Sequence, residues 1–107
     1  QGPVNRGVRF EVEAALELAE AALWYHQRRA GLGAEFMESI DAALELVRQW
    51  PEAAPRASGV AEVLNIRRAP VPRFPYGIIY AASSHDIQVL AIAHNSRESD
   101  YWIRGMR

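Results

Sequence analysis

The N-terminal part of the chain changes from a two-residue to a three-to-four-residue repeat of apolar positions. In the stretch GVRFEVE at 7–13, Val8 and Phe10 fall on one face, as in a short strand. From Val12 to His26 the apolar residues recur at helical spacing and predict a helix that turns this row to the core. The row consists of Val12, Ala15, Leu16, Ala19, Ala22, Leu23 and His26. The solvent side of this helix is expected to carry Glu13, Glu17 and Glu20.

A second helix is predicted between the glycines of RRAGLG, which end the first helix, and the prolines after position 50. Gly31 and Gly33 in RRAGLG can adopt the backbone that ends the first helix. The second helical row is Phe36, Ile40, Ala43, Leu44 and Val47. Because the connection is short, the two helices are expected to form an antiparallel hairpin. Prolines and a glycine in WPEAAPRASG at 50–59 end the second helix and predict an irregular segment.

The C-terminal part of the chain is built of short runs rich in β-branched and aromatic residues. AEVLNIRR at 61–68, YGIIYAA at 76–82 and IQVLAIAH at 87–94 each predict a strand. The polar stretch SSHD at 83–86 predicts a turn, so the last two strands are expected to form a hairpin.

The order of these elements predicts the fold class. The tail NSRESDYWIRGMR predicts a short final helix, with Ser96 or Ser99 as its cap. Helices followed by a run of strands indicate an α+β fold. We expect an N-terminal strand and an antiparallel helical hairpin packed on an antiparallel β-sheet. At 107 residues, positions 1–107 form one domain, and Gln1–Pro3 resembles the remnant of a cleaved tag.

The composition excludes several classes of site. The chain has no cysteine, which excludes disulfides and cysteine-based zinc sites and fits a reducing compartment. No apolar run approaches the roughly 20 residues of a membrane span. The histidines, His26, His85 and His94, lack metal-ligand spacing, and no glycine-rich phosphate loop is present. We therefore expect no metal, no cofactor and no membrane partner.

The net charge of −1 hides an uneven distribution. Residues 1–66 carry six arginines and ten acidic residues, whereas residues 67–107 carry six arginines and three. All twelve basic residues are arginine, and RRAPVPRFPYGIIY at 67–80 holds three of them without any acid. A GC-rich genome explains arginine use throughout a chain, whereas recognition of phosphate or carboxylate groups explains a local cluster. Both explanations stay open.

Four segments carry a resemblance to a known family: AALWYHQRRAGLGAEFMESIDAAL, WPEAAPR, RRAPVPRFPYGIIY and IQVLAIAHNSRESDYW. They contain a Trp-Tyr pair with a basic turn, a proline-containing exit, an Arg-Phe-Pro-Tyr strand entry and a His-x-x-Arg stretch before Tyr-Trp. In this order and spacing they resemble the RelE/ParE family of bacterial toxins from type II toxin–antitoxin systems. The resemblance extends from about Val8 to Trp102.

This resemblance implies a cytoplasmic growth inhibitor that a cognate antitoxin neutralises, as in plasmid stabilization systems, in a dimer or higher toxin–antitoxin complex. RelE-like members are mRNA interferases that cleave messenger RNA on the ribosome, and ParE-like members inhibit DNA gyrase. The absence of lysine, the Arg-Phe-Pro-Tyr stretch and the tail beyond the last strand favour the ParE-like branch. A binding module of the same fold with decayed activity is a third hypothesis.

The two branches assign different roles to the C-terminal residues. A ribonuclease would be metal-independent and would use His94, Arg73 and Arg97 as catalytic residues, with Arg67 on the phosphate and Glu62 as an alternative to His94 in proton transfer. Each has a structural alternative: Arg73 stacked on an aromatic ring, His94 bonded to the following turn, Arg97 in an ion pair.

A partner surface is the other expectation for this region. An antitoxin segment across the sheet would bury its arginines and aromatics. The expected partner-binding residues are Arg67, Arg68, Arg73, Phe74, Tyr76, Tyr101 and Trp102. Because Arg67 and Arg68 are consecutive in a strand, they are expected on opposite faces.

Overall fold

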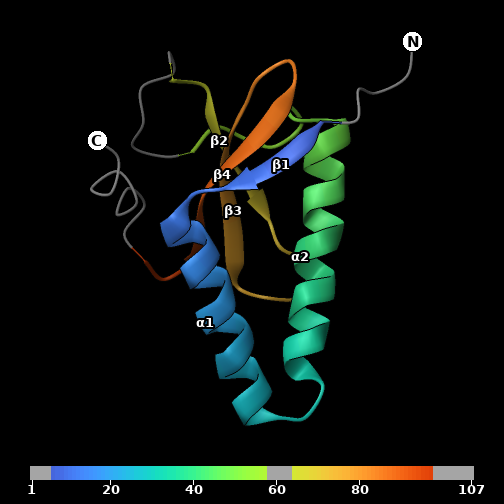
Figure 1. Cartoon of the computed structure of the whole chain (residues 1–107), viewed down its shortest axis with the longest axis vertical. Helices are drawn as coiled ribbons and strands as arrows, with labels where there is room; N and C mark the ends of the chain where they lie inside the picture. Colours follow the sequence, from blue (N-terminus) through green and yellow to red (C-terminus); the bar gives the residue numbers. More distant parts are fainter. Residues whose placement is uncertain (1–5, 58–63, 98–107) are drawn as a thin grey trace.

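Two helices lie side by side against a four-stranded sheet, and the turn that joins them projects beyond it (Figure 1). The computed structural model describes residues 6–57 and 64–97. In chain order the elements are β1 (Gly7–Phe10), α1 (Val12–Arg28), α2 (Leu32–Gln49), β2 (Ile66–Pro70), β3 (Tyr76–Ala82) and β4 (Asp86–His94). The predicted element order is confirmed up to the last strand. The expected helix in the tail lies largely outside the described residues.

The sheet has the strand order β1-β4-β3-β2 and is mixed. The β2–β3 and β3–β4 pairs are antiparallel, as predicted, and the α+β fold class is confirmed. β1 pairs in parallel with β4, from Gly7 beside Asp86 to Phe10 beside Val89. The sequence predicted the N-terminal strand but neither its partner nor its direction. Alternation along a strand indicates its two faces but not the direction of its neighbour.

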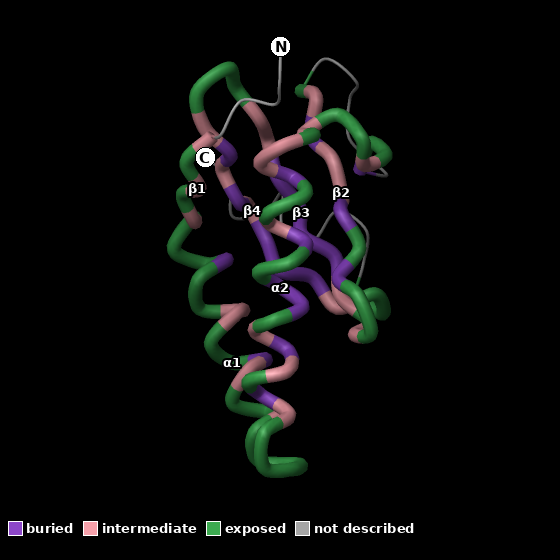
Figure 2. Tube along the Cα trace, turned by 90° about the vertical axis from the view of Figure 1, so that its right-hand side faces the viewer, coloured by how far each residue is buried: buried purple, intermediate pink, exposed green. Residues whose placement is uncertain are grey.

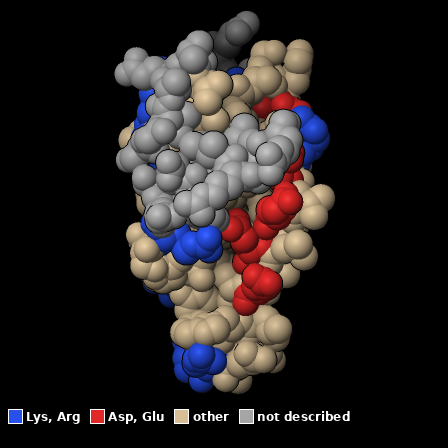
Figure 3. All heavy atoms as spheres, turned by 90° about the vertical axis from the view of Figure 1, so that its left-hand side faces the viewer, with Lys and Arg blue, Asp and Glu red and all other residues tan. Residues whose placement is uncertain are grey.

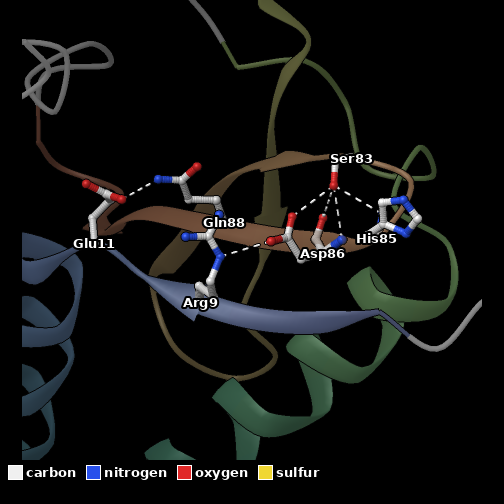
Figure 4. Close-up of polar contacts among 6 residues, drawn as sticks. All are labelled: Arg9, Glu11, Ser83, His85, Asp86 and Gln88. Carbon is white, nitrogen blue, oxygen red and sulfur yellow. Dashed lines mark hydrogen bonds and ion pairs between the residues drawn. The ribbon is translucent and has the colours of Figure 1, made fainter.

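A group of polar side chains fastens β1 to the β3–β4 hairpin (Figure 4). Ser83 Oγ accepts the backbone N–H groups of His85 and Asp86 at 3.1 and 3.0 Å and donates to Asp86 Oδ1 at 2.9 Å. Arg9 Nε donates to Asp86 Oδ2 at 2.9 Å. The hydrogen bond from Ser83, followed by the one from Arg9, holds the pKa of Asp86 below its usual value. Asp86 therefore joins the hairpin turn to the edge strand.

The main core fills the space between the helices and one face of the sheet. Figure 2 shows the buried positions along the strands and on the inner sides of both helices. Its largest fully buried side chains are Phe36, Ile40, Ile78, Tyr80, Ile87 and Val89. Each such side chain contributes about 1.5–3 kcal/mol by leaving water. A smaller cluster lies on the other face of the sheet and contains Ala57, Ile66, Ile79, Ala91 and Ala93.

Helix α1 turns a different face to the core from the one that its sequence predicts. Ala14 and Ala21 are buried, whereas Val12, Leu16 and Leu23 are 71%, 58% and 55% exposed. The prediction that the row containing these three residues faces the core was wrong. The helix carries two apolar rows, and the one with small side chains allows α1 to approach β4 and α2 closely. Periodicity identifies the helix but does not choose between two such rows.

Glycines shape the helical hairpin at two positions. Gly31 has φ +86°, a left-handed backbone that only glycine adopts without cost, and it ends the turn before α2. Gly33 lies where α2 meets α1: a Cβ atom there would be 2.7 Å from the carbonyl oxygen of Ala22 and 3.2 Å from Cβ of His26. The absence of a side chain at Gly33 therefore sets how closely the two helices approach.

We predict that Gly33→Ala lowers the free energy of unfolding by about 1–3 kcal/mol, because the added methyl group meets backbone that cannot move away. Gly7→Ala is the matched control, since its Cβ has nothing within 4 Å, and stability should be unchanged or slightly higher. Urea unfolding of both variants measures the difference. Equal stability of the two variants would contradict this account of the helix contact.

Candidate functional site

A cleft of about 560 Å³ opens between α1 and the ends of β3 and β4. Glutamate and aromatic side chains of α1 form one wall, and residues of the sheet and of the turn after β4 form the other. The lining residues are Glu17, Glu20, Ala21, Trp24, Tyr25, Pro75, Tyr76, Ile92, His94 and Arg97. Its size and its mixture of aromatic and charged walls suit a peptide segment or a similar ligand.

The edge of β4 beside this cleft has an unusual hydrogen-bond partner. β1 pairs with β4 only as far as Val89, so no described strand neighbours the next part of that edge. The backbone N–H of Ile92 instead donates to Glu17 Oε1 at 2.9 Å. A carboxylate from α1 thus takes the place of a strand partner and satisfies a backbone donor that would otherwise be buried without a bond.

Aromatic rings form the floor of the cleft. The Tyr76 ring centroid lies 5.2 Å from that of Phe36 and 5.1 Å from that of His94. Burial raises the pKa of Tyr25 and of Tyr76, and the neighbouring Tyr25 and Glu17 raise that of Tyr76 further. Both phenols therefore stay protonated at neutral pH, so they can donate hydrogen bonds and pack but cannot act as general bases.

His94 is bonded to the turn that follows β4. Its Nδ1 accepts the backbone N–H of Ser96 at 3.0 Å, and the Ser96 hydroxyl lies 2.8 Å from the same atom. Because Nδ1 accepts the backbone N–H, a neutral ring carries its proton on Nε2. This is the structural alternative that the sequence offered for His94. A catalytic role for this residue stays a prediction.

Arg67 and Arg68 point to opposite faces of the sheet, as expected. Arg67 is on the helix side, where its Nη1 donates to the carbonyl oxygen of Ala54 at 2.6 Å. Arg68 crosses the other face, and its Nη2 donates to the carbonyl oxygen of Ala93 at 3.2 Å and to Asn95 Oδ1 at 2.7 Å.

Gly77 provides the space for this crossing, since a Cβ there would lie 2.5 Å from Arg68 Nε. Because Gly77 is on β3 and the acceptors of Arg68 are on and after β4, the side chain ties β2 to β4 across the middle strand.

The remaining sequence-predicted residues are dispersed. Arg73 is exposed with φ +70°, and its Cζ atom lies 5.8 Å from the Phe74 ring centroid, which matches the stacked alternative. Phe74 packs between Tyr25 and Phe36. Arg97 lines the cleft with His94 and Tyr76, whereas Arg73 does not. Glu62, Tyr101 and Trp102 lie outside the described residues.

The sequence pattern did not predict that side chains of α1 form one wall of the cleft. The sequence places Glu17 and Glu20 on the solvent side of the helix, and it singles out Trp24 and Tyr25 only as the Trp-Tyr pair of the family resemblance. Tyr25 does pack in the core, but Trp24 is 49% exposed, with Arg28 Cζ 3.9 Å above its ring. The spacing of Glu17, Glu20 and Trp24 puts them on one helical face, which is the signal that could have grouped them.

Acidic side chains form a row along α1, and arginines lie at the turn that joins α1 to α2. Acidic side chains follow one another down the face shown in Figure 3, with basic side chains beside the upper and middle parts of this row. Basic side chains also lie at the end that Figure 1 identifies as the turn between the helices. The arginines of this turn include Arg28, over Trp24, and Arg29, which pairs with Glu35 at 3.3 Å. A partner that lies along this face would therefore meet a row of acidic residues, and arginines at the projecting tip.

Residues 6–57 and 64–97 contain no group of three or more His, Asp or Glu side chains able to hold a metal ion. Neither α1 nor α2 has the length and apolar composition that crossing a bilayer requires.

Comparison with known proteins supports the fold. No family model and no curated protein matches the sequence. Among solved structures, a chain from the "Chromosomal ParDE TA system from P. aeruginosa" has a similar fold, with a TM-score of 0.67 at 19% sequence identity. The match covers 84% of this chain and 96% of that one. The predicted RelE/ParE-like fold is confirmed.

We predict that Glu17→Ala lowers the free energy of unfolding by about 1–3 kcal/mol, because it leaves the Ile92 N–H without its acceptor. Glu17→Gln keeps an oxygen at the same place and should lose less. The control is Glu20→Ala, an exposed glutamate of the same helix, which should change stability by no more than about 0.5 kcal/mol. Amide hydrogen exchange at Ile92 should accelerate in Glu17→Ala alone, and equal exchange rates in both variants would argue against this role.

Proposed function

We propose that this chain is the toxin of a type II toxin–antitoxin pair, a cytoplasmic growth inhibitor that binds DNA gyrase and is neutralised by a cognate antitoxin. The observation that carries the proposal is the fold shared with a chain of the ParDE system, over most of both chains. One fold can serve several functions, so the choice of target rests on the chemistry of the site.

The site lacks a convincing set of groups for RNA cleavage. That reaction needs a base near the attacking hydroxyl and cations around the phosphate. Arg73 projects over Phe74, away from the cleft that His94 and Arg97 line. Arg68 is bonded to a carbonyl and an amide oxygen. This dispersal favours a toxin that acts by binding, although the shared position of His94 and Arg97 keeps ribosome-dependent cleavage as the second candidate.

The cleft is the best candidate for the antitoxin. Glu17 and Glu20 on one wall favour a segment with basic side chains on that side, and Trp24 and Tyr76 favour apolar ones. The sequence suggested instead that the segment covers the arginines of β2. Arg67 and Arg68 already donate to oxygens of this chain, so the geometry supports docking along α1 more than docking over them.

We predict that purified, antitoxin-free protein abolishes gyrase supercoiling of a plasmid and causes cleaved plasmid to accumulate. Induction of the protein should arrest growth, and His94→Ala should retain the arrest because a gyrase binder does not need that ring. A folded protein that arrests growth without any effect on gyrase, and loses the arrest in His94→Ala, would instead identify a ribonuclease. A folded protein without any arrest would mean decayed activity.

We also predict that Trp24→Ala weakens binding of the antitoxin encoded beside this chain by at least about tenfold, as expected for a tryptophan at the centre of an interface. Trp50→Ala is the matched control: Trp50 is similarly exposed, at 53%, but lies outside the cleft. Calorimetric titration of both variants measures the difference. Equal affinities would exclude the cleft as the antitoxin site.

A further inference from the structure

We propose that a second hollow, at the other end of β2 and β3, binds a small oxyanion through its phosphate or carboxylate group. The hollow has a volume of about 270 Å³, and its lining residues include Arg6, Glu52, Asn65, Arg67 and Tyr80. None of its described lining residues lines the cleft along α1. The inference is independent of the proposed toxin function.

Arg67 provides the positive charge. Its Nη1 donates to the carbonyl oxygen of Ala54 at 2.6 Å, but its Nε is buried without a hydrogen-bond partner. Among the described residues, no carboxylate lies within ion-pair distance of this guanidinium. The Nε–H and the adjacent Nη2 group form the edge of a guanidinium that binds an oxyanion with two parallel hydrogen bonds. That edge of Arg67 is therefore chemically complementary to a phosphate or carboxylate.

Asn65 provides a second group without a partner. Its side-chain oxygen is buried and makes no hydrogen bond. The residue has φ +51°, a left-handed backbone that asparagine adopts more readily than most residues with a side chain. Rotation of the amide exchanges its oxygen for its NH₂ group. Asn65 can then donate to an anion held by Arg67, which accounts for both unsatisfied side chains with one ligand.

The other walls add positive charge and a rigid floor. The Tyr80 hydroxyl donates to the carbonyl oxygen of Pro51 at 2.5 Å, which fixes the ring beside Arg67. Arg6 is held by donation from Nε to the carbonyl oxygen of Ser83 at 2.9 Å. Among the described residues that line the hollow, Glu52 is the one acid, so Arg6 and Arg67 leave a positive balance. Because the unsatisfied atoms of Arg67 and Asn65 are shielded, binding requires both side chains to rotate into the hollow.

Titration of the 107-residue chain with inorganic phosphate, followed by backbone-amide NMR at constant ionic strength, tests the proposal. Acetate is titrated separately, and sodium chloride is the ionic-strength control. We expect saturable shifts at Asn65, Arg67 and Tyr80 with either oxyanion but not with chloride. If phosphate binds more tightly than acetate, the natural ligand carries a phosphate group; if acetate binds more tightly, it carries a carboxylate.

Variants assign the effect to the hollow. Arg67→Gln should weaken binding at least about tenfold, since it removes the charge and the two-donor edge. Asn65→Gly should weaken binding several-fold while it retains the fold, because glycine accepts the left-handed backbone. Arg29→Gln, at the tip of the helical hairpin, is the control and should bind like the unaltered chain. Shifts that do not saturate, that chloride reproduces, or that persist unchanged in Asn65→Gly and Arg67→Gln would overturn the proposal.

Discussion

The close contact of α1 with α2 and β4 is the constraint on which the rest of the structure depends. It is made by the smallest side chains available: Ala14 and Ala21 on α1, and Gly33, which has none, on α2. Because these side chains are small, the backbone of α1 lies close to α2 and β4 and gains dispersion contacts. Larger side chains would hold these elements apart. Because these residues face inward, the larger Val12, Leu16 and Leu23 face outward, and this one choice of helix face determines which surface the molecule presents.

The cleft follows from the same contact. With α1 held against β4 by its alanines, Glu17 reaches the free edge of the strand and takes the Ile92 N–H. Two turns further along α1, Trp24 also lines the cleft, and its ring centroid lies 5.1 Å from that of Tyr25. A strand edge next to an acidic helix is protected from pairing with other chains by its carboxylate neighbour. It also offers a defined segment a place to bind, which is what the proposed antitoxin requires.

The arginines of the segment 67–80 show how a local excess of one charge can be dispersed by the fold. Arg67 is on the helix face, Arg68 lies across the opposite face over Gly77, and Arg73 extends over Phe74. The three do not form one basic surface, because neighbouring residues of a strand point to opposite faces and Arg73 follows the end of β2. The segment instead contributes a strap between strands, a charge in a hollow and an exposed stacked residue.

The sequence alone predicted the elements from β1 to β4, their order and the β3–β4 hairpin, because helical and alternating repeats and turn residues are local properties. The RelE/ParE-like fold followed from the resemblance of its motifs to that family. The sequence also determined that Arg67 and Arg68 face opposite ways. The tertiary structure alone decided the parallel pairing of β1 and the buried row of α1. It also decided that α1 residues such as Glu17 join Tyr76 and His94 in one cleft. These depend on contacts between segments far apart in the chain, where packing selects among alternatives that local periodicity leaves equal.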